Sequence, residues 1–176
     1  MQYDLVSTPL GPVMVAGDPT GVKLITFMKG DGERRPESSW KRDPGALRRA
    51  SNEIRAYFAG ELEEFEMKLS LEGTPFQKRV WKAVARVPYG KTASYGQIAR
   101  RLGKPDACRA VGAANGSNPI PIVIPCHRII GSTGKLTGYG GGLWIKEALL
   151  KLENGGRQPP RQRGLFPRVR TSAARP

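Results

Sequence analysis

The fold is decided by one stretch, Ser94-Tyr-Gly-Gln-Ile-Ala-Arg-Arg-Leu-Gly-Lys-Pro-Asp-Ala-Cys-Arg-Ala-Val-Gly-Ala-Ala-Asn115. It opens on the Ser-x-x-Gln pattern of a capping box, which predicts a short helix through Leu102. Gly-Lys-Pro at 103–105 predicts a turn, and Asp106 is the expected cap of a second helix that runs to the end of the stretch. Two short helices joined in this way indicate a helix-turn-helix.

Capped or apolar segments lie on both sides of this stretch. Thr74-Pro-Phe-Gln77 is a strong helix opening, because threonine caps, proline suits the first helical position and glutamine can reach back to the cap. That helix is expected to bury Trp81 and to stop near Pro88. Residues 118–125 are apolar but too rich in proline for a helix, so they predict a buried extended segment that ends at Cys126. The last helix is expected over 143–153, ended by Gly155.

The first third of the chain has strand patterns instead. Strands are predicted at 2–7, 13–16, 22–27 and 65–71, a helix at 44–58 and an exposed loop at 30–43. The fold class is therefore α+β, with a small α/β domain at residues 1–72 and a mostly helical domain with the helix-turn-helix at 73–156. Residues 157–176 hold six arginines and no apolar periodicity, which predicts a disordered basic tail.

Positive charge is concentrated in the second half of the chain. Residues 1–72 hold 10 Lys and Arg against 12 Asp and Glu, residues 73–156 hold 13 against 3, and residues 157–176 hold 6 against none. A basic surface can simply aid solubility. Confinement to one half is, however, what a polyanion-binding face needs, so nucleic acid is the expected partner.

Nothing in the sequence indicates export or a membrane. The first residues contain no apolar run of signal-peptide length, and the longest apolar run, around 120–126, is too short to span a bilayer. The two cysteines, Cys108 and Cys126, are expected to be free thiols. We therefore expect a cytoplasmic protein that does not bind membranes.

Cys126 and His127 form the one place where a nucleophile and a titratable base adjoin, because His127 is the only histidine. The dipeptide alone is equally compatible with a buried cysteine that acts as a small hydrophobe. The surrounding motifs distinguish a reactive cysteine from a buried apolar one. They are Arg109-Ala-Val-Gly-Ala-Ala-Asn115, Asn118-Pro, Ile124-Pro-Cys-His-Arg128, Gly138-Tyr-Gly-Gly-Gly-Leu143 and Lys146-Glu147. Taken in order, these blocks closely resemble the alkylguanine-DNA alkyltransferase family over roughly residues 74–155.

The resemblance implies a fold and a reaction. It implies a ribonuclease-H-like N-terminal domain and a C-terminal domain that binds double-stranded DNA through the minor groove and flips the damaged nucleotide out of the stack. Cys126 is then expected to take an alkyl group from O6-alkylguanine, with O4-alkylthymine left open as a second substrate. The product is a thioether that water cannot hydrolyse, so each molecule reacts once.

The resemblance also implies roles for individual residues. Cys126 is the nucleophile, His127 accepts its proton through a water, and Glu153 orients the imidazole. Asn118 supports the loop around the thiol by hydrogen bonds. As an alternative, Glu153 is a solvated acid at the end of a surface helix, although a carboxylate there is slightly unfavourable.

Tyr95 and the loop of Tyr139, Gly140 and Gly141 are expected to bind the flipped guanine, the loop through backbone amides that act like an oxyanion hole. Some family members carry serine where this chain has Gly140, so a hydroxyl donor to the O6 is missing here. The protein is then expected to accept a wider range of bulky alkyl groups. As an alternative, Tyr95 is a packing residue.

Arg109 is expected to fill the gap left by the flipped base, or alternatively to bind phosphate. The other expected DNA contacts are Ala110, Ala113 and Arg128. We expect no cofactor, and no metal, because residues 1–73 lack the cysteines and histidines with which some relatives bind zinc. The protein is expected to be a monomer, with cooperative DNA binding left open.

Two other functions fit part of the sequence. A helix-turn-helix module without chemistry would explain the basic half and the capped helices but not the motif around Cys126. A thiol hydrolase would use Cys126 and His127 through an acyl-enzyme, but it would leave the basic half unexplained.

Overall fold

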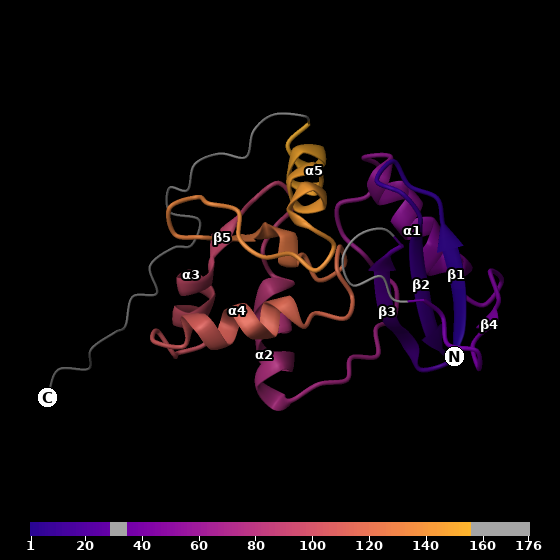
Figure 1. Cartoon of the computed structure of the whole chain (residues 1–176), viewed down its shortest axis with the longest axis horizontal. Helices are drawn as coiled ribbons and strands as arrows, with labels where there is room; N and C mark the ends of the chain where they lie inside the picture. Colours follow the sequence, from indigo (N-terminus) through magenta and orange to yellow (C-terminus); the bar gives the residue numbers. More distant parts are fainter. Residues whose placement is uncertain (29–34, 156–176) are drawn as a thin grey trace, which may run out of the picture.

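The computed structural model describes residues 1–28 and 35–155, which form a sheet-containing part and a helical part lying side by side (Figure 1). The predicted tail at 157–176 and part of the predicted loop at 30–43 lie outside the described residues. Within the described ranges, no helix is long and apolar enough to cross a membrane. The α+β class predicted from the sequence is confirmed.

The N-terminal part is built on a four-stranded sheet of order β3-β2-β1-β4. Strands β1 (Gln2–Val6), β2 (Val13–Asp18) and β3 (Gly21–Phe27) form an antiparallel meander, as their β-branched residues and the turn signals between them predict. Helix α1 (Arg48–Phe58) lies across this sheet and buries Ile54 and Tyr57. Its apolar residues recur every three or four positions, so one helix face joins the core.

Three N-terminal predictions are wrong in detail. The helix predicted over 44–58 starts only at Arg48, and Leu47 at its cap makes no side-chain hydrogen bond. The predicted strand at 65–71 is reduced to a bridge between Leu69 and Val22, because only its middle lies along the start of β3. The predicted loop contains a short edge strand, β4 (Lys41–Arg42), which pairs in parallel with β1.

The helical part contains the predicted helix-turn-helix. Helices α2 (Pro75–Val84) and α3 (Tyr95–Arg101) both begin with complete capping boxes, at Thr74 and Ser94. The second helix of the motif is α4 (Cys108–Gly116), but the predicted cap at Asp106 is wrong: Asp106 lies in the preceding turn, and Ala107 occupies the cap position without a side-chain bond. Trp81 anchors α2 to α4 by donating its indole hydrogen to the Ala114 carbonyl at 2.7 Å.

Cys126 reaches its position through a folded segment rather than an extended one. Residues 118–125 turn back on themselves, with a bridge between Pro121 and Ile124, and Ile122 adopts a φ of 77° that is rare for a β-branched residue. The segment is fixed to the N-terminal sheet, because the Ile25 amide donates to the Pro119 carbonyl at 2.9 Å. The prediction that the segment is extended is therefore wrong.

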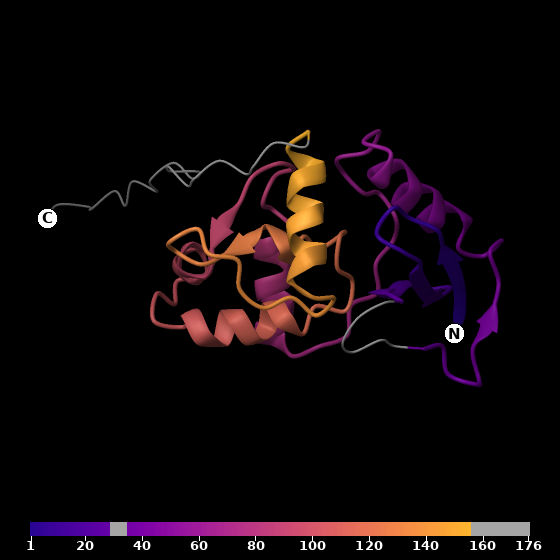
Figure 2. The same cartoon turned by 45° about the horizontal axis from the view of Figure 1, so that its top comes forward.

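After that turn come the 3-10 helix η1 (Cys126–Arg128), strand β6 (Ile129–Ile130) and the last helix, α5 (Leu143–Glu153). Strand β6 pairs in parallel with β5 (Ala93–Ser94), which leads directly into α3. Helix α5 stands beside this pair and faces the N-terminal part (Figure 2). Side chains of both parts form one continuous core. The cysteine segment is thus held between the helix-turn-helix, the last helix and the sheet.

Replacing Thr74 with alanine should lower the free energy of unfolding by about 1 kcal/mol, because α2 would lose the acceptor for the Gln77 amide. Urea unfolding followed by circular dichroism measures this change. Thr133→Ala is the matched control, since Thr133 is exposed and makes no hydrogen bond to any described residue. Equal losses in the two variants would contradict the capping role.

Candidate active site

The Cys126 thiol lies at the start of η1, between the turn at 118–125 and helix α5. Its residue is only 6% exposed. The Cys126 amide donates to the Ile124 carbonyl at 2.7 Å, and this tight local turn sets the direction of the side chain. Cys108, by contrast, is exposed on α4. Both cysteines are free thiols, as the sequence predicts.

Two asparagines hold the backbone around the thiol. Asn118 donates to the Ile124 carbonyl at 2.8 Å and accepts from the Ile120 amide at 3.0 Å. The buried Asn115 of α4 donates to the Cys126 carbonyl at 3.4 Å. The supporting position predicted for Asn118 is therefore present, and Asn115 adds a second support that the sequence did not single out.

Burial raises the pKa of the Cys126 thiol, and the Asn118 side chain and the charge of Lys146 offset only part of this effect. A raised pKa opposes formation of the thiolate, which is the nucleophilic form. The thiol therefore needs a base close to it to become a nucleophile near neutral pH.

His127 follows Cys126 in the chain and is the candidate for that base. It is completely buried, and its Nε2 lies 2.7 Å from Oε1 of Glu153. This contact places the proton of a neutral imidazole on Nε2 and leaves Nδ1 as the acceptor. Nδ1 is buried and bonds to none of the described residues. Burial lowers the pKa of His127, against the opposing effect of Glu153, so the imidazole is neutral and able to accept a proton.

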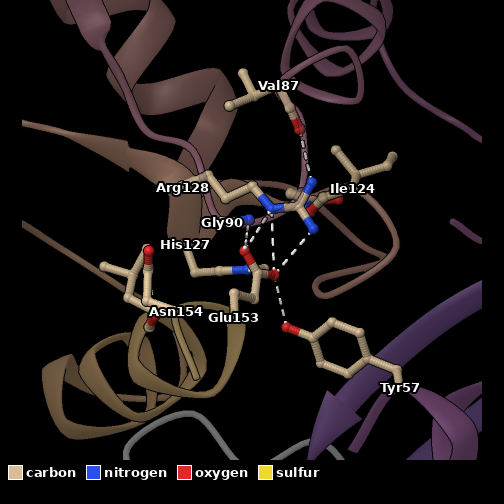
Figure 3. A network of polar contacts seen from close by, with 10 residues as sticks. Tyr57, Val87, Gly90, Ile124, His127, Arg128, Glu153 and Asn154 are labelled. Atoms are coloured by element: carbon tan, nitrogen blue, oxygen red, sulfur yellow. Dashed lines mark hydrogen bonds and ion pairs between the residues drawn. The ribbon is translucent and has the colours of Figure 1, made fainter. Parts of the chain in front are cut away.

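Glu153, the last residue of α5, is the centre of the polar network in Figure 3. It is buried, so the alternative that it is a solvated surface acid is wrong. Its two oxygens accept hydrogen bonds from His127, from the guanidinium of Arg128, from the Tyr57 hydroxyl and from the Gly90 amide. The hydrogen bonds from His127 and Arg128 outweigh burial and lower the pKa of Glu153 to about 2.

Arg128 is inside the protein, which makes its predicted contact with DNA wrong. Its Nε lies 2.9 Å from Oε2 of Glu153, and its Nη1 donates to the Val87 carbonyl at 2.6 Å. The guanidinium also stacks over the Tyr89 ring, at 5.6 Å from the centroid. A side chain held in this way neutralises Glu153 and has no route to a phosphate.

The loop before α5 closes over the thiol. The Tyr139 hydroxyl is buried without an aligned hydrogen bond to a described residue, and burial together with the nearby Cys126 raises its pKa well above the ordinary value. A Cβ at Gly141 would lie 3.0 Å from Ile145 and 3.3 Å from the Tyr139 ring, so this position has little room for a side chain. At Gly140 nothing lies within 4 Å of such a Cβ, so a serine would fit there.

Lys146 of α5 joins this loop to β6. Its ammonium group donates to the carbonyls of Ile129, at 2.6 Å, and Thr137, at 2.8 Å. Burial lowers its pKa to about 8. In the sequence Lys146 stands out only through the family resemblance, because a lysine in an amphipathic helix gives no signal that it points inward.

The other residues expected to face DNA lie on α3 and α4. Arg109, Ala110 and Ala113 are exposed on α4, and Tyr95 is half-buried at the start of α3. Thr137 donates to the Tyr95 hydroxyl at 3.3 Å, which links the loop over the thiol to the helix-turn-helix. The roles of these residues stay predictions. No cluster of three potential metal ligands occurs in residues 1–28 and 35–155, and the absence of a metal also stays a prediction.

The wild-type protein should lose stability as the pH falls below about 6.5, the ordinary pKa of histidine. In that range His127 binds a proton in the unfolded chain but not in the native protein, where its pKa is lowered. The free energy of unfolding then falls by about 1.4 kcal/mol for each pH unit. Urea unfolding between pH 7.5 and 5 measures the slope. His127→Gln should flatten it, because the chain has no other histidine. A variant as pH-sensitive as the wild type would assign the effect to another group.

Comparisons with known proteins match both parts of the chain. A family model described as 6-O-methylguanine DNA methyltransferase, ribonuclease-like domain, matches residues 1–71, and one described as the DNA binding domain of the same family matches residues 75–155. The methylated-DNA–protein-cysteine methyltransferase of Methanosarcina acetivorans is 53% identical over 87% of this chain and 98% of its own.

A solved structure extends the likeness to the backbone. The crystal structure of Mycobacterium tuberculosis OGT in complex with DNA is similar with a TM-score of 0.82 and 49% identity, over 90% of this chain and 96% of that one. The matches extend across both parts of the chain. The chain belongs to the 6-O-methylguanine DNA methyltransferase family.

Proposed function

We propose that this protein repairs DNA by transferring an alkyl group from O6-alkylguanine to Cys126, once per molecule. The observation that carries the proposal is the buried thiol next to the only histidine, whose Nε2 is held by Glu153 at 2.7 Å. That arrangement leaves Nδ1 of His127 as a base for a thiol that cannot ionise readily by itself. O4-alkylthymine is the second substrate to be tested.

The reaction begins with removal of the thiol proton. A water between Cys126 and Nδ1 of His127 passes the proton to the imidazole, and the Glu153 carboxylate stabilises the imidazolium that forms. The thiolate then attacks the saturated alkyl carbon, so that the sulfur–carbon bond forms as the carbon–O6 bond breaks. The released electron pair stays on guanine, which takes up a proton. No carbonyl is left for water to attack, so the thioether is permanent.

The base has to leave the duplex to reach this thiol. In our proposal Tyr95 and the loop of Tyr139, Gly140 and Gly141 hold the flipped guanine, and backbone amides of the loop bind the O6 as charge develops. The absence of a hydroxyl at Gly140 leaves this stabilisation to the backbone. The space around Gly140 fits acceptance of bulkier alkyl groups.

Helix α4 is the proposed DNA-reading element. The small exposed side chains of Ala110 and Ala113 permit a close approach to the minor groove, and Arg109 fills the gap in the stack. The partner is double-stranded DNA that contains alkylated bases, bound by a monomer. We divide the chain into an α/β domain at 1–72, the alkyltransferase domain at 73–156 and a basic tail at 157–176. A cytoplasmic location fits a mechanism that needs a reduced thiol.

Incubation with duplex DNA that contains O6-methylguanine should add one methyl group to the intact protein, because the thioether is not hydrolysed. Mass spectrometry of the protein and its peptides measures the addition and maps it to Cys126. Cys126→Ser should stay unmodified, and Cys108→Ser should react like the wild type. A DNA-binding module without chemistry would show no mass change, and a thiol hydrolase would show only transient acyl adducts.

Arg109→Ala should slow methyl transfer from duplex DNA by about tenfold or more while nonspecific DNA affinity falls only slightly, because flipping loses the side chain that fills the stack. Single-turnover rates on duplex DNA and on free O6-benzylguanine separate flipping from chemistry. Arg101→Ala, on the neighbouring helix, is the control for lost positive charge. An equal loss on the free base would contradict the proposed role.

A further inference from the structure

The catalytic network contains one residue from the N-terminal part of the chain. Tyr57 of α1 is completely buried, and its hydroxyl donates to Oε1 of Glu153 at 2.8 Å. The same oxygen lies 2.7 Å from Nε2 of His127. Figure 3 shows the phenol approaching Glu153 from the N-terminal side. Tyr57 and His127 therefore share a single acceptor atom.

The carboxylate is held in place without Tyr57. Arg128 donates through Nε to Oε2 at 2.9 Å and through Nη2 to Oε1 at 2.9 Å, and the Gly90 amide donates to Oε2 at 3.2 Å. These bonds fix both the position and the rotation of Glu153. The Tyr57 hydroxyl is therefore not needed to place Oε1, and its remaining effect is on the negative charge of that oxygen.

The Tyr57 hydroxyl lies among aromatic rings, where a hydrogen bond has a large effect on the charge of the carboxylate oxygen. The Tyr57 ring packs edge-on against Phe58, with centroids 5.3 Å apart, and against Tyr89, at 6.2 Å, and Phe65 covers a further side. Burial raises the pKa of Tyr57 well above its ordinary value, so the phenol is a neutral donor at neutral pH. In this dry surrounding a hydrogen bond to a carboxylate has a strong electrostatic effect.

We propose that Tyr57 is a positioning residue of the proton relay: its hydroxyl shares the Glu153 oxygen that faces His127 and limits how strongly Glu153 draws a proton onto the imidazole. The inference rests on the proposed function of Cys126, His127 and Glu153. His127 must be neutral to accept the thiol proton, and an unshared carboxylate beside it would favour the protonated imidazole before the reaction starts. The N-terminal domain thereby sets the proton affinity of the base.

Other charged and titratable groups also face this pair, and all of them stay in place when only the Tyr57 hydroxyl is removed. Arg128 and Lys146 disfavour a proton on His127, and Glu153 favours it. The remaining titratable neighbours of the network are Tyr89, Cys126 and Tyr139. A single-atom change at position 57 therefore tests one contribution against a constant background.

The test is the titration of the one imidazole in the chain, followed by NMR of ¹⁵N-labelled histidine, which needs no assignment. Tyr57→Phe removes the hydroxyl and keeps the buried ring, and it should raise the titration midpoint of His127 by about one pH unit. The acid limb of methyl transfer should move to higher pH by a similar amount. Replacing Tyr57 with 3-fluorotyrosine, a stronger donor, should move both readouts in the opposite direction.

Tyr89→Phe is the matched control, since the Tyr89 ring lies in the same cluster and its hydroxyl makes no hydrogen bond to a described residue. It should leave the midpoint unchanged. An unshifted midpoint in both Tyr57 variants would overturn the inference and reduce Tyr57 to a packing contact between the two parts. A wild-type protein that titrates as expected but takes no methyl group from DNA would instead overturn the proposed function.

Discussion

The rest of the structure depends on one buried negative charge, the carboxylate of Glu153. A charge without partners in a protein interior is strongly unfavourable, so its donors must be in place whenever the chain is folded. They come from α1, from the loop after α2 and from η1. Removal of one partner of such a pair destabilises a protein by about 3–5 kcal/mol. The carboxylate therefore ties the last helix to both parts of the chain as well as serving the imidazole.

Burial has two opposite effects on the chemistry. It raises the pKa of the Cys126 thiol, which disfavours the nucleophile, and it lowers the pKa of His127, which keeps Nδ1 of the imidazole unprotonated. The dry surrounding also strengthens each remaining electrostatic contact. The site thus holds a protonated thiol and a neutral base until a substrate arrives, which suits a protein that can react only once.

Local sequence signals predicted the helical half well. The capping boxes at Thr74 and Ser94 are short-range patterns, and both are present as predicted. Long-range contacts gave no such signal. Arg128 was expected to contact DNA, and only the arrival of Glu153 from 25 positions away explains its burial. Tyr57 falls within the helix predicted over 44–58, but the sequence gives no sign of its contact with a residue 96 positions away. The turn at Ile122 was also missed, because an unusual φ at a β-branched residue has no sequence pattern.

The place of Glu153 at the last position of α5 has a consequence for the newly made chain. Synthesis proceeds from the N-terminus, so Cys126 and His127 leave the ribosome before the carboxylate that completes their proposed relay. Until the final helix docks, the thiol has no oriented base beside it and reacts as an ordinary cysteine. The proposed transfer of an alkyl group through this relay therefore has to wait until the last helix has docked.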